Sequence, residues 1–388
     1  MGFAFFNWDM NIAMGTRIFG AWTASHTISE LRNGSYLLVF LIISIGLNIG
    51  KAVGADEICS GAVTSKCLAD LALHDANHVD DNHWRGLAHA AIASAELEFG
   101  DSAGALIDLD RASASIQVES NKFNQVEGLI RIAVTQAELG EFIAAEQNIA
   151  RAAAIADVII LPDWRYWALS FLPRAKAKTC AFVEAKESIE ESVISVKLIG
   201  DIVARASAST HIAAAQIEIG DPKGAMRTAE RILQVVSKID DEFWTTELLS
   251  EVALLQGRAG DIEGARASLA RALSIAKGID ASWRNWRLAK FALVEVQLYE
   301  SVLSRERISD LVGILYDDIS DESLAGWRTF AFAYLSKALA IVEAREAGRV
   351  PSSLLSARQC ARRAQVFFPY FSSIVSFLMD RGSPGTLL

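Results

Sequence analysis

Beyond residue 80, small and apolar side chains recur along this chain at intervals of forty positions. One column of this frame holds Ile92, Ile132, Leu172, Ile212 and Val252, and the next holds Ala93, Ala133, Pro173, Ala213 and Ala253. A third column holds Ala105, Ala145, Ala185, Ala225 and Ala265. Small residues at fixed positions allow helices to pack closely. The period predicts stacked two-helix units, each too small to bury its own apolar face.

The turn inside each unit has a pattern of its own. The turn glycines are Gly100, Gly140, Gly220 and Gly260. A glycine in the left-handed conformation ends a first helix, and the aspartate that follows three of these glycines can cap the second helix. The third unit departs from the pattern, because Pro173 lies within its first helix and Cys180 replaces the glycine, so we expect a kink. Alanine, leucine, isoleucine and glutamate dominate, so the expected class is all-α.

The spacing within a unit resembles that of the tetratricopeptide repeat family. Ala93, Gly100, Ala105 and Ala112 are separated by seven, five and seven positions, and the same intervals recur in the next unit. The period of forty is longer than the family's, which is about thirty-four residues. The resemblance implies a right-handed α-solenoid of helical hairpins with an extended concave surface. It also implies protein or peptide ligands and assembly roles in the cell envelope.

We expect four segments along the chain. They are a leader over residues 1–55, an N-terminal cap over 56–80, the repeat array over 81–345, and C-terminal capping helices with a tail over 346–388. Atypical terminal repeats are the usual way in which an array seals its two ends.

The leader contains the longest apolar run of the chain, from Tyr36 to Gly50. The small residues Val53 and Ala55 follow it in the pattern that a signal peptidase accepts. We therefore expect cleavage near Ala55 and a periplasmic or secreted protein. The alternatives are an uncleaved inner-membrane anchor or a buried core helix, and translation could start at Met14.

Charge and cysteine content narrow the classes of function. A formal net charge of −10 without a visible basic stripe excludes nucleic acid as the expected ligand. Four cysteines are too few for a disulfide scaffold, although export would permit a bridge between Cys59 and Cys67. The chain has no phosphate-binding glycine loop, nucleophile elbow or Cys-x-x-Cys pair. We expect neither enzymatic activity nor a cofactor.

The best candidate for a metal site is a histidine cluster. His74 and His78 lie one helical turn apart, and Asp81, His83 or His89 would have to supply a third ligand. This cluster carries the alternative function of a metal-dependent hydrolase or metal-binding protein. Its positions coincide, in the forty-residue frame, with the ordinary ends of second helices, which favours a structural role.

The main hypothesis is an exported, non-catalytic scaffold that binds another protein, and a small-ligand-responsive regulatory array is a further alternative. The side chains predicted to face the groove are His89, Glu96, Gln136, Gln216, Glu247 and Gln256. The recurring Trp-Arg pairs, such as Trp84 and Arg85, are interpreted as packing devices in which tryptophan joins neighbouring repeats and arginine pairs with an upstream aspartate. The aromatic segment from Val366 to Met379 either covers the end of the array or makes peripheral contact with a membrane.

Overall fold

The computed structural model describes residue 59, residues 63–298, 305–317 and 325–350, and residue 360. The chain divides into two compact units, Met1–Gly54 and Ala55–Leu388, and every described residue belongs to the second. The described residues form helices and contain no strand, so the all-α prediction is confirmed. None of their helices is long and apolar enough to cross a membrane. The predicted leader and the aromatic segment from Val366 to Met379 lie outside the described residues.

The repeat units are helical hairpins, each made of a first and a second helix. The pairs are α4 (Asn82–Phe99) with α5 (Ser102–Gln117), α6 (Lys122–Leu139) with α7 (Phe142–Asp157), α9 (Leu172–Lys178) with α10 (Phe182–Ser195), α11 (Ile202–Glu218) with α12 (Pro222–Val236), α13 (Glu242–Arg258) with α14 (Ile262–Ala276), and α15 (Ala281–Leu298) with α16 (Arg305–Asp317). Helix α17 (Ala325–Glu346) is the final member of the series of first helices. Helix α3 (Ser65–Ala76) precedes all of these helices in the chain.

The predicted turn chemistry is present. Gly100 ends α4 with a φ of 93°, and the Asp101 carboxylate accepts a hydrogen bond from the backbone N–H of Gly104 at 2.8 Å. In the third unit the first helix is broken into α8 (Pro162–Leu169) and α9, and the short 3₁₀ helix η4 (Val196–Leu198) follows α10. Cys180 adopts the left-handed conformation of the missing glycine, with a φ of 67°. The predicted kink is therefore confirmed.

The alanine columns lie where helices meet. Ala93, Ala105 and Ala112 in the first hairpin are completely buried, as are Ala133, Ala145 and Ala152 in the second. A larger side chain at any of these positions would push the two helices apart.

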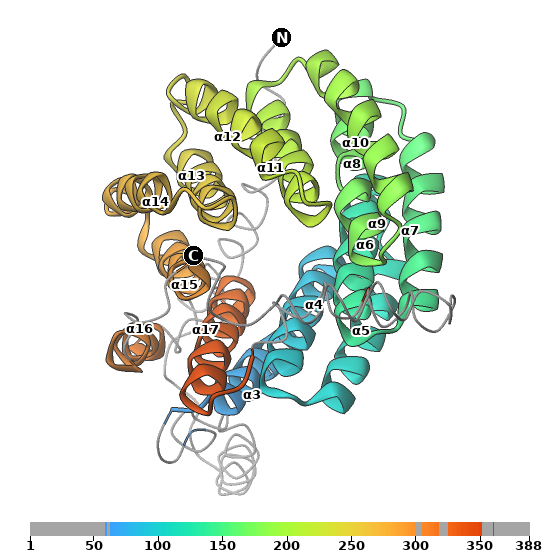
Figure 1. The fold of residues 1–388 in the computed structure, drawn as a ribbon. Coiled ribbons are helices and arrows are strands. Elements are labelled where there is room, and N and C mark those ends of the chain that lie inside the picture. The colour runs from blue at the N-terminus through green and yellow to red at the C-terminus, as the bar shows by residue number, and fades with distance from the viewer. Residues whose placement is uncertain (1–58, 60–62, 299–304, 318–324, 351–359, 361–388) are drawn as a thin grey trace, which may run out of the picture. The chain divides into compact units, whose positions relative to one another are not determined.

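The first helices form a closed ring. They contact one another in the order α4, α6, α9, α11, α13, α15 and α17, and α17 then contacts α4. Helix α3 packs along α17 as closely as the second helix of a hairpin packs on its first helix, and Figure 1 shows the two helices side by side, next to α4. The start of the described chain thus packs on α17 in the position of a second helix.

Polar contacts fasten this closure. The Arg328 guanidinium on α17 donates to both carboxylate oxygens of Asp75 on α3, at 2.6 and 2.9 Å, and both side chains are buried. The Ser336 hydroxyl donates to the backbone carbonyl of Ser65, and Lys337 donates to the Ser94 hydroxyl on α4. Within the predicted N-terminal cap over residues 56–80, α3 packs on α17 and α4. The predicted C-terminal capping helices over 346–388 lie largely outside the described residues.

Candidate functional site

The glutamines predicted to face a groove lie instead between the two helices of their own hairpins. Gln216 accepts a hydrogen bond from the Thr228 hydroxyl at 3.0 Å, and Gln256 accepts one from the Ser268 hydroxyl at 2.7 Å. Gln136 accepts one from the Asn148 amide at 2.9 Å. Each partner lies twelve positions further along the chain. These glutamines join the helices of a hairpin. Gln216 and Gln256 are buried, so the expectation that they face an open surface is wrong for these two, and Gln136 is half-buried.

His89 and Glu96 occupy a similar interior position in the first hairpin. The imidazole of His89 lies 2.8 Å from Asp108 on α5, and both groups are buried. Burial, followed by the negative charges of Asp108 and Asp101, raises the pKa of Glu96 to about 8. A neutral Glu96 carboxyl at pH 7 thus takes the place of the glutamine found in the other hairpins. Neither side chain lies on an open groove, contrary to the prediction.

Glu247 is the one predicted binding residue that faces neighbouring first helices. Its carboxylate pairs with Arg287, and with Lys290 on the same helix, α15. Burial alone would raise its pKa, but Arg287 and Lys290 outweigh that effect and lower it to about 2. Arg287 is fully buried, and its guanidinium lies over the rings of Phe243 and Trp286. These partners indicate a contact that joins α13 to α15.

The histidine candidates do not form a metal centre. The rings of His74 and His78 are tilted relative to one another with centroids 5.0 Å apart, and His78 contacts the backbone carbonyl of His74. His83 lies on another helix, with its Nε2 3.5 Å from a carboxylate oxygen of Glu127. Nowhere in the described ranges do three His, Cys, Asp or Glu side chains gather in a way that could hold a metal ion.

The tryptophans join neighbouring repeats, as predicted, but the arginine beside the first of them acts differently from the prediction. Trp84 packs edge-on against Trp327, with ring centroids 5.0 Å apart, which adds an aromatic contact between α4 and α17. Arg85 donates to the backbone carbonyls of Val79 and Asp80 and to the Ser115 hydroxyl. It therefore orders the preceding loop through main-chain carbonyls, because these acceptors point at it while the nearby aspartates cap helices.

A ladder of ion pairs, which was not predicted, runs from one first helix to the next. Lys178 on α9 lies 3.2 Å from Glu138 on α6 and 3.3 Å from Glu218 on α11, and Arg258 on α13 lies 2.9 Å from Glu218. The four residues occupy one column of the forty-residue frame and alternate in sign. Burial acts to raise the pKa of Glu218, but Arg258 and Lys178 lower it to about 2. The ladder stabilises the stacking of consecutive repeats.

A second group of ionisable side chains lies on the first helices α6, α11, α13 and α15. Glu127 and Arg131 on α6 form an ion pair, and Glu251 on α13 pairs with Lys290. Burial lowers the pKa of His211 on α11 to about 4 even though the charges of Glu251 and Glu127 oppose the change. At neutral pH this imidazole is uncharged, and it packs on the Phe171 ring. The network balances positive and negative charge through contacts within the ring.

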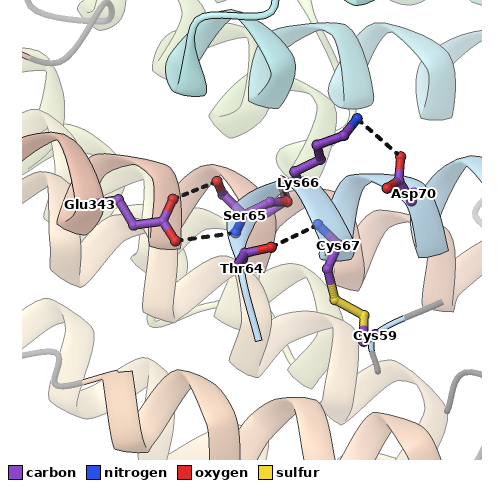
Figure 2. Close-up of a disulfide and its surroundings, with 8 residues drawn as sticks. Cys59, Thr64, Ser65, Lys66, Cys67, Asp70 and Glu343 are labelled. Carbon is purple, nitrogen blue, oxygen red and sulfur yellow. Dashed lines mark hydrogen bonds and ion pairs between the residues drawn. A yellow bond between two sulfur atoms is a disulfide. The ribbon is translucent and has the colours of Figure 1, made fainter. Parts of the chain in front are cut away.

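Two disulfides use all four cysteines. Figure 2 shows the Cys59–Cys67 bridge, which the sequence permitted without deciding, at the start of α3, where the Thr64 hydroxyl caps the helix and Glu343 of α17 binds Ser65. The Cys180–Cys360 bridge, which was not predicted, ties the turn between α9 and α10 to a residue beyond α17. Its two cysteines are 180 positions apart, so no local spacing could have indicated the pairing.

The most unusual surface of the described protein is the outer side of three consecutive hairpins. Of fourteen large apolar residues that the described part of the chain exposes, eleven lie between positions 106 and 198. They are Leu106, Ile107, Val118, Ile143, Val158, Ile160, Leu161, Phe182, Val183, Ile194 and Leu198. We call the exposed side of α5, α7 and α10, together with their following loops, the outer apolar face.

Some of these apolar columns become charged in the next two hairpins. Ile143 and Val183, which are 74% and 69% exposed, correspond to Lys223 on α12 and Glu263 on α14. Leu198 corresponds to Lys238. An ordinary solvated second helix in this protein thus carries charge at these positions. The apolar side chains on α7 and α10 are not required by the repeat architecture, which points to contact with another molecule.

The outer apolar face also carries a net negative charge. The exposed residues within α5, α7 and α10 include seven acidic and three basic side chains. Those within α12 and α14 include five basic and two acidic side chains. The outer surface of the described repeats therefore has one apolar and acidic part and one basic part.

Comparison with known proteins adds no assignment. No protein-family model matches this chain, and no curated protein matches it at a significant level.

Proposed function

We propose that this chain is an exported, non-catalytic scaffold that binds another protein through the outer apolar face. The resemblance to tetratricopeptide repeats supports a right-handed α-solenoid of hairpins, here with its two ends joined. Such arrays commonly act by presenting a surface to a protein or peptide. The observation that carries the proposal is the concentration of exposed large apolar residues on three consecutive hairpins, whereas α12 and α14 expose none and carry charge at the positions equivalent to Ile143 and Val183.

The binding surface differs from the one that the sequence predicted. A concave groove would use side chains on the first helices, but the predicted glutamines face their hairpin partners and Glu247 is held by cations of α15. The outer apolar face leaves Ile143, Val158 and Val183 open to solvent at 74%, 54% and 69%. Burying such side chains releases about 25 cal/mol per Å² of apolar surface, so a partner gains most by covering them.

Disulfide pairing supports export. Bridges such as Cys59–Cys67 and Cys180–Cys360 form and persist in oxidising compartments and are rare in the cytosol. The described residues leave no cysteine free. We therefore propose a periplasmic or secreted location, with cleavage near Ala55.

Co-purification from the export compartment tests the proposal. We would tag the full chain, crosslink briefly and quantify stoichiometric partners for the wild type and for the double variant Ile143→Lys, Val183→Lys. The matched control is Lys223→Glu, which alters the same column on α12. We expect one dominant partner that the double variant loses and the control keeps. A partner retained by both variants would contradict the assignment of the face.

A further inference from the structure

We propose that the partner presents an amphipathic helix whose apolar stripe is flanked by lysine or arginine, and that this helix packs along α7. The inference rests on the proposed function, because it names the chemistry of the partner at the outer apolar face. Its observations are the outward stripe of α7 and the charges on α10, the second helix of the next hairpin.

Helix α7 offers an uncharged stripe to its surroundings. Ile143, Gln147, Ala150, Ala154 and Val158 are all exposed and follow one another at intervals of four, three, four and four positions. These intervals place them on one side of the helix. The apolar ends supply buried area, and the two alanines between them allow a second helix to approach closely.

Helix α10, the second helix of the hairpin that follows α7, supplies the charge. Glu184, Glu187, Glu190 and Glu191 are exposed, and within the helix only Lys186 opposes them. Phe182, Val183 and Ile194 lie at the two ends of the same helix and are exposed. A partner helix on α7 would therefore gain from basic residues on its α10 side, and acidic residues there would be repelled.

Other occupants fit these charges less well. A second copy using the same face would bring together two surfaces with seven acidic and three basic exposed side chains each. The outer side of α12 and α14 is basic, but its equivalent positions carry Lys223, Lys238 and Glu263 and offer little apolar surface. Anionic lipid headgroups would be repelled by α10. A basic amphipathic helix satisfies both the apolar and the acidic parts of the face.

Two synthetic peptides provide the probe. Both are about eighteen residues long and share one leucine stripe, which lysines flank in the first and glutamates flank in the second. A scrambled lysine peptide with dispersed leucines measures non-specific attraction to the acidic chain. Binding of each labelled peptide to the full chain is followed by fluorescence anisotropy at low and high salt. We expect the lysine peptide to bind at least about tenfold more tightly than the other two, with an advantage that salt reduces.

Variants separate the charge inference from the docking proposal. The triple variant Glu184→Lys, Glu187→Lys, Glu191→Lys should reverse the peptide preference, and Ile143→Lys should weaken binding of the lysine peptide. Glu263→Lys on α14 is the matched control and should change neither the peptide preference nor the binding of the lysine peptide.

Equal binding of the lysine and glutamate peptides would overturn the charge inference but would be consistent with docking at the outer apolar face. Failure of all peptides to bind would overturn the amphipathic-helix partner, and the co-purification experiment then decides the docking proposal separately. A concentration-dependent dimer that Ile143→Lys abolishes would assign the face to a second copy and overturn the inference.

Discussion

Replacing Lys178 by methionine should destabilise the folded chain strongly, because this lysine is the cation shared by two carboxylates in the ion-pair ladder. Its ammonium lies 3.2 Å from Glu138 and 3.3 Å from Glu218, and its side chain is 4% exposed. Methionine keeps most of the side-chain volume and the apolar stem. The change therefore removes the charge with little effect on packing, and it leaves Glu138 facing Glu218 without the cation between them.

The magnitude follows from the burial of the ladder. Removing one partner of a buried ion pair costs about 3–5 kcal/mol, because the remaining charge stays desolvated. The pKa of Glu218 gives a consistent figure, since its lowering from 4.5 to about 2 corresponds to about 3 kcal/mol of favourable interaction. Arg258 contributes part of that amount, but Lys178 also lowers the pKa of Glu138. We expect Lys178→Met to lose about 3–5 kcal/mol of unfolding free energy.

Urea unfolding of the oxidised full chain at several pH values is the assay. Because the folded-state pKa of Glu218 is lowered, its contribution is complete above pH 4.5 and is lost as the pH falls towards 2. The difference between wild type and Lys178→Met should therefore be largest at neutral pH and shrink on acidification. Lys66→Met is the control, since Lys66 is 67% exposed and pairs with Asp70 at the surface. A loss below about 1 kcal/mol for Lys178→Met, or one that does not change with pH, would refute the reasoning.

Three further predictions follow from contacts elsewhere in the described residues. Asp75→Ala removes the bidentate carboxylate partner of the buried Arg328 on α17 and should lower the free energy of unfolding in urea by about 3–5 kcal/mol. The surface change Asp70→Ala should lower it by less than about 1 kcal/mol. Equal losses would contradict the proposal that the Asp75–Arg328 contact stabilises the closure of the ring. The pKa of Glu96 is raised to about 8, so stability falls as pH rises from 4.5 to 8, and Glu96→Gln should be more stable than wild type above pH 8 and equal to it below pH 4.5 in thermal unfolding. Cys180→Gly and Cys360→Ala break the same disulfide, but only Cys180→Gly removes the conformational cost of a non-glycine residue in the left-handed region. Cys180→Gly should therefore be the more stable variant by about 1 kcal/mol in guanidinium titrations. The opposite order would show that the turn carries no such cost.

Local structure could be predicted from the sequence because its causes are local. Glycine turns such as Gly100 and the break near Pro173 depend on backbone conformations that a few neighbouring residues determine. The closure of the ring could not be predicted in this way. The Asp75–Arg328 contact joins positions 253 apart, and the forty-residue frame describes how neighbours stack without saying where the first unit meets the last.

The candidate site was predicted less well, although part of the signal was present. A polar residue on a first helix looks the same in sequence whether it faces a groove or its own hairpin partner. Gln216 and Gln256 each have a hydroxyl residue twelve positions later, and this recurrence indicates a structural contact in the same way as the recurring tryptophans. The alternating signs at Glu138, Lys178 and Glu218 likewise predict a ladder once the column is inspected. The outer apolar face would have been visible as Ile143 and Val183 against Lys223 in one column.

Site-specific photo-crosslinking tests most directly whether the outer apolar face binds a protein. A photoreactive amino acid would be placed at Val183 on α10 or at Lys223 on α12, which occupy the same column and are both exposed. The full chain would be expressed in the export compartment and its adducts identified by mass spectrometry. We predict one dominant adduct with another protein from position 183 and none above background from position 223. Equal adducts from both positions, or only adducts between segments of the same chain, would contradict the account.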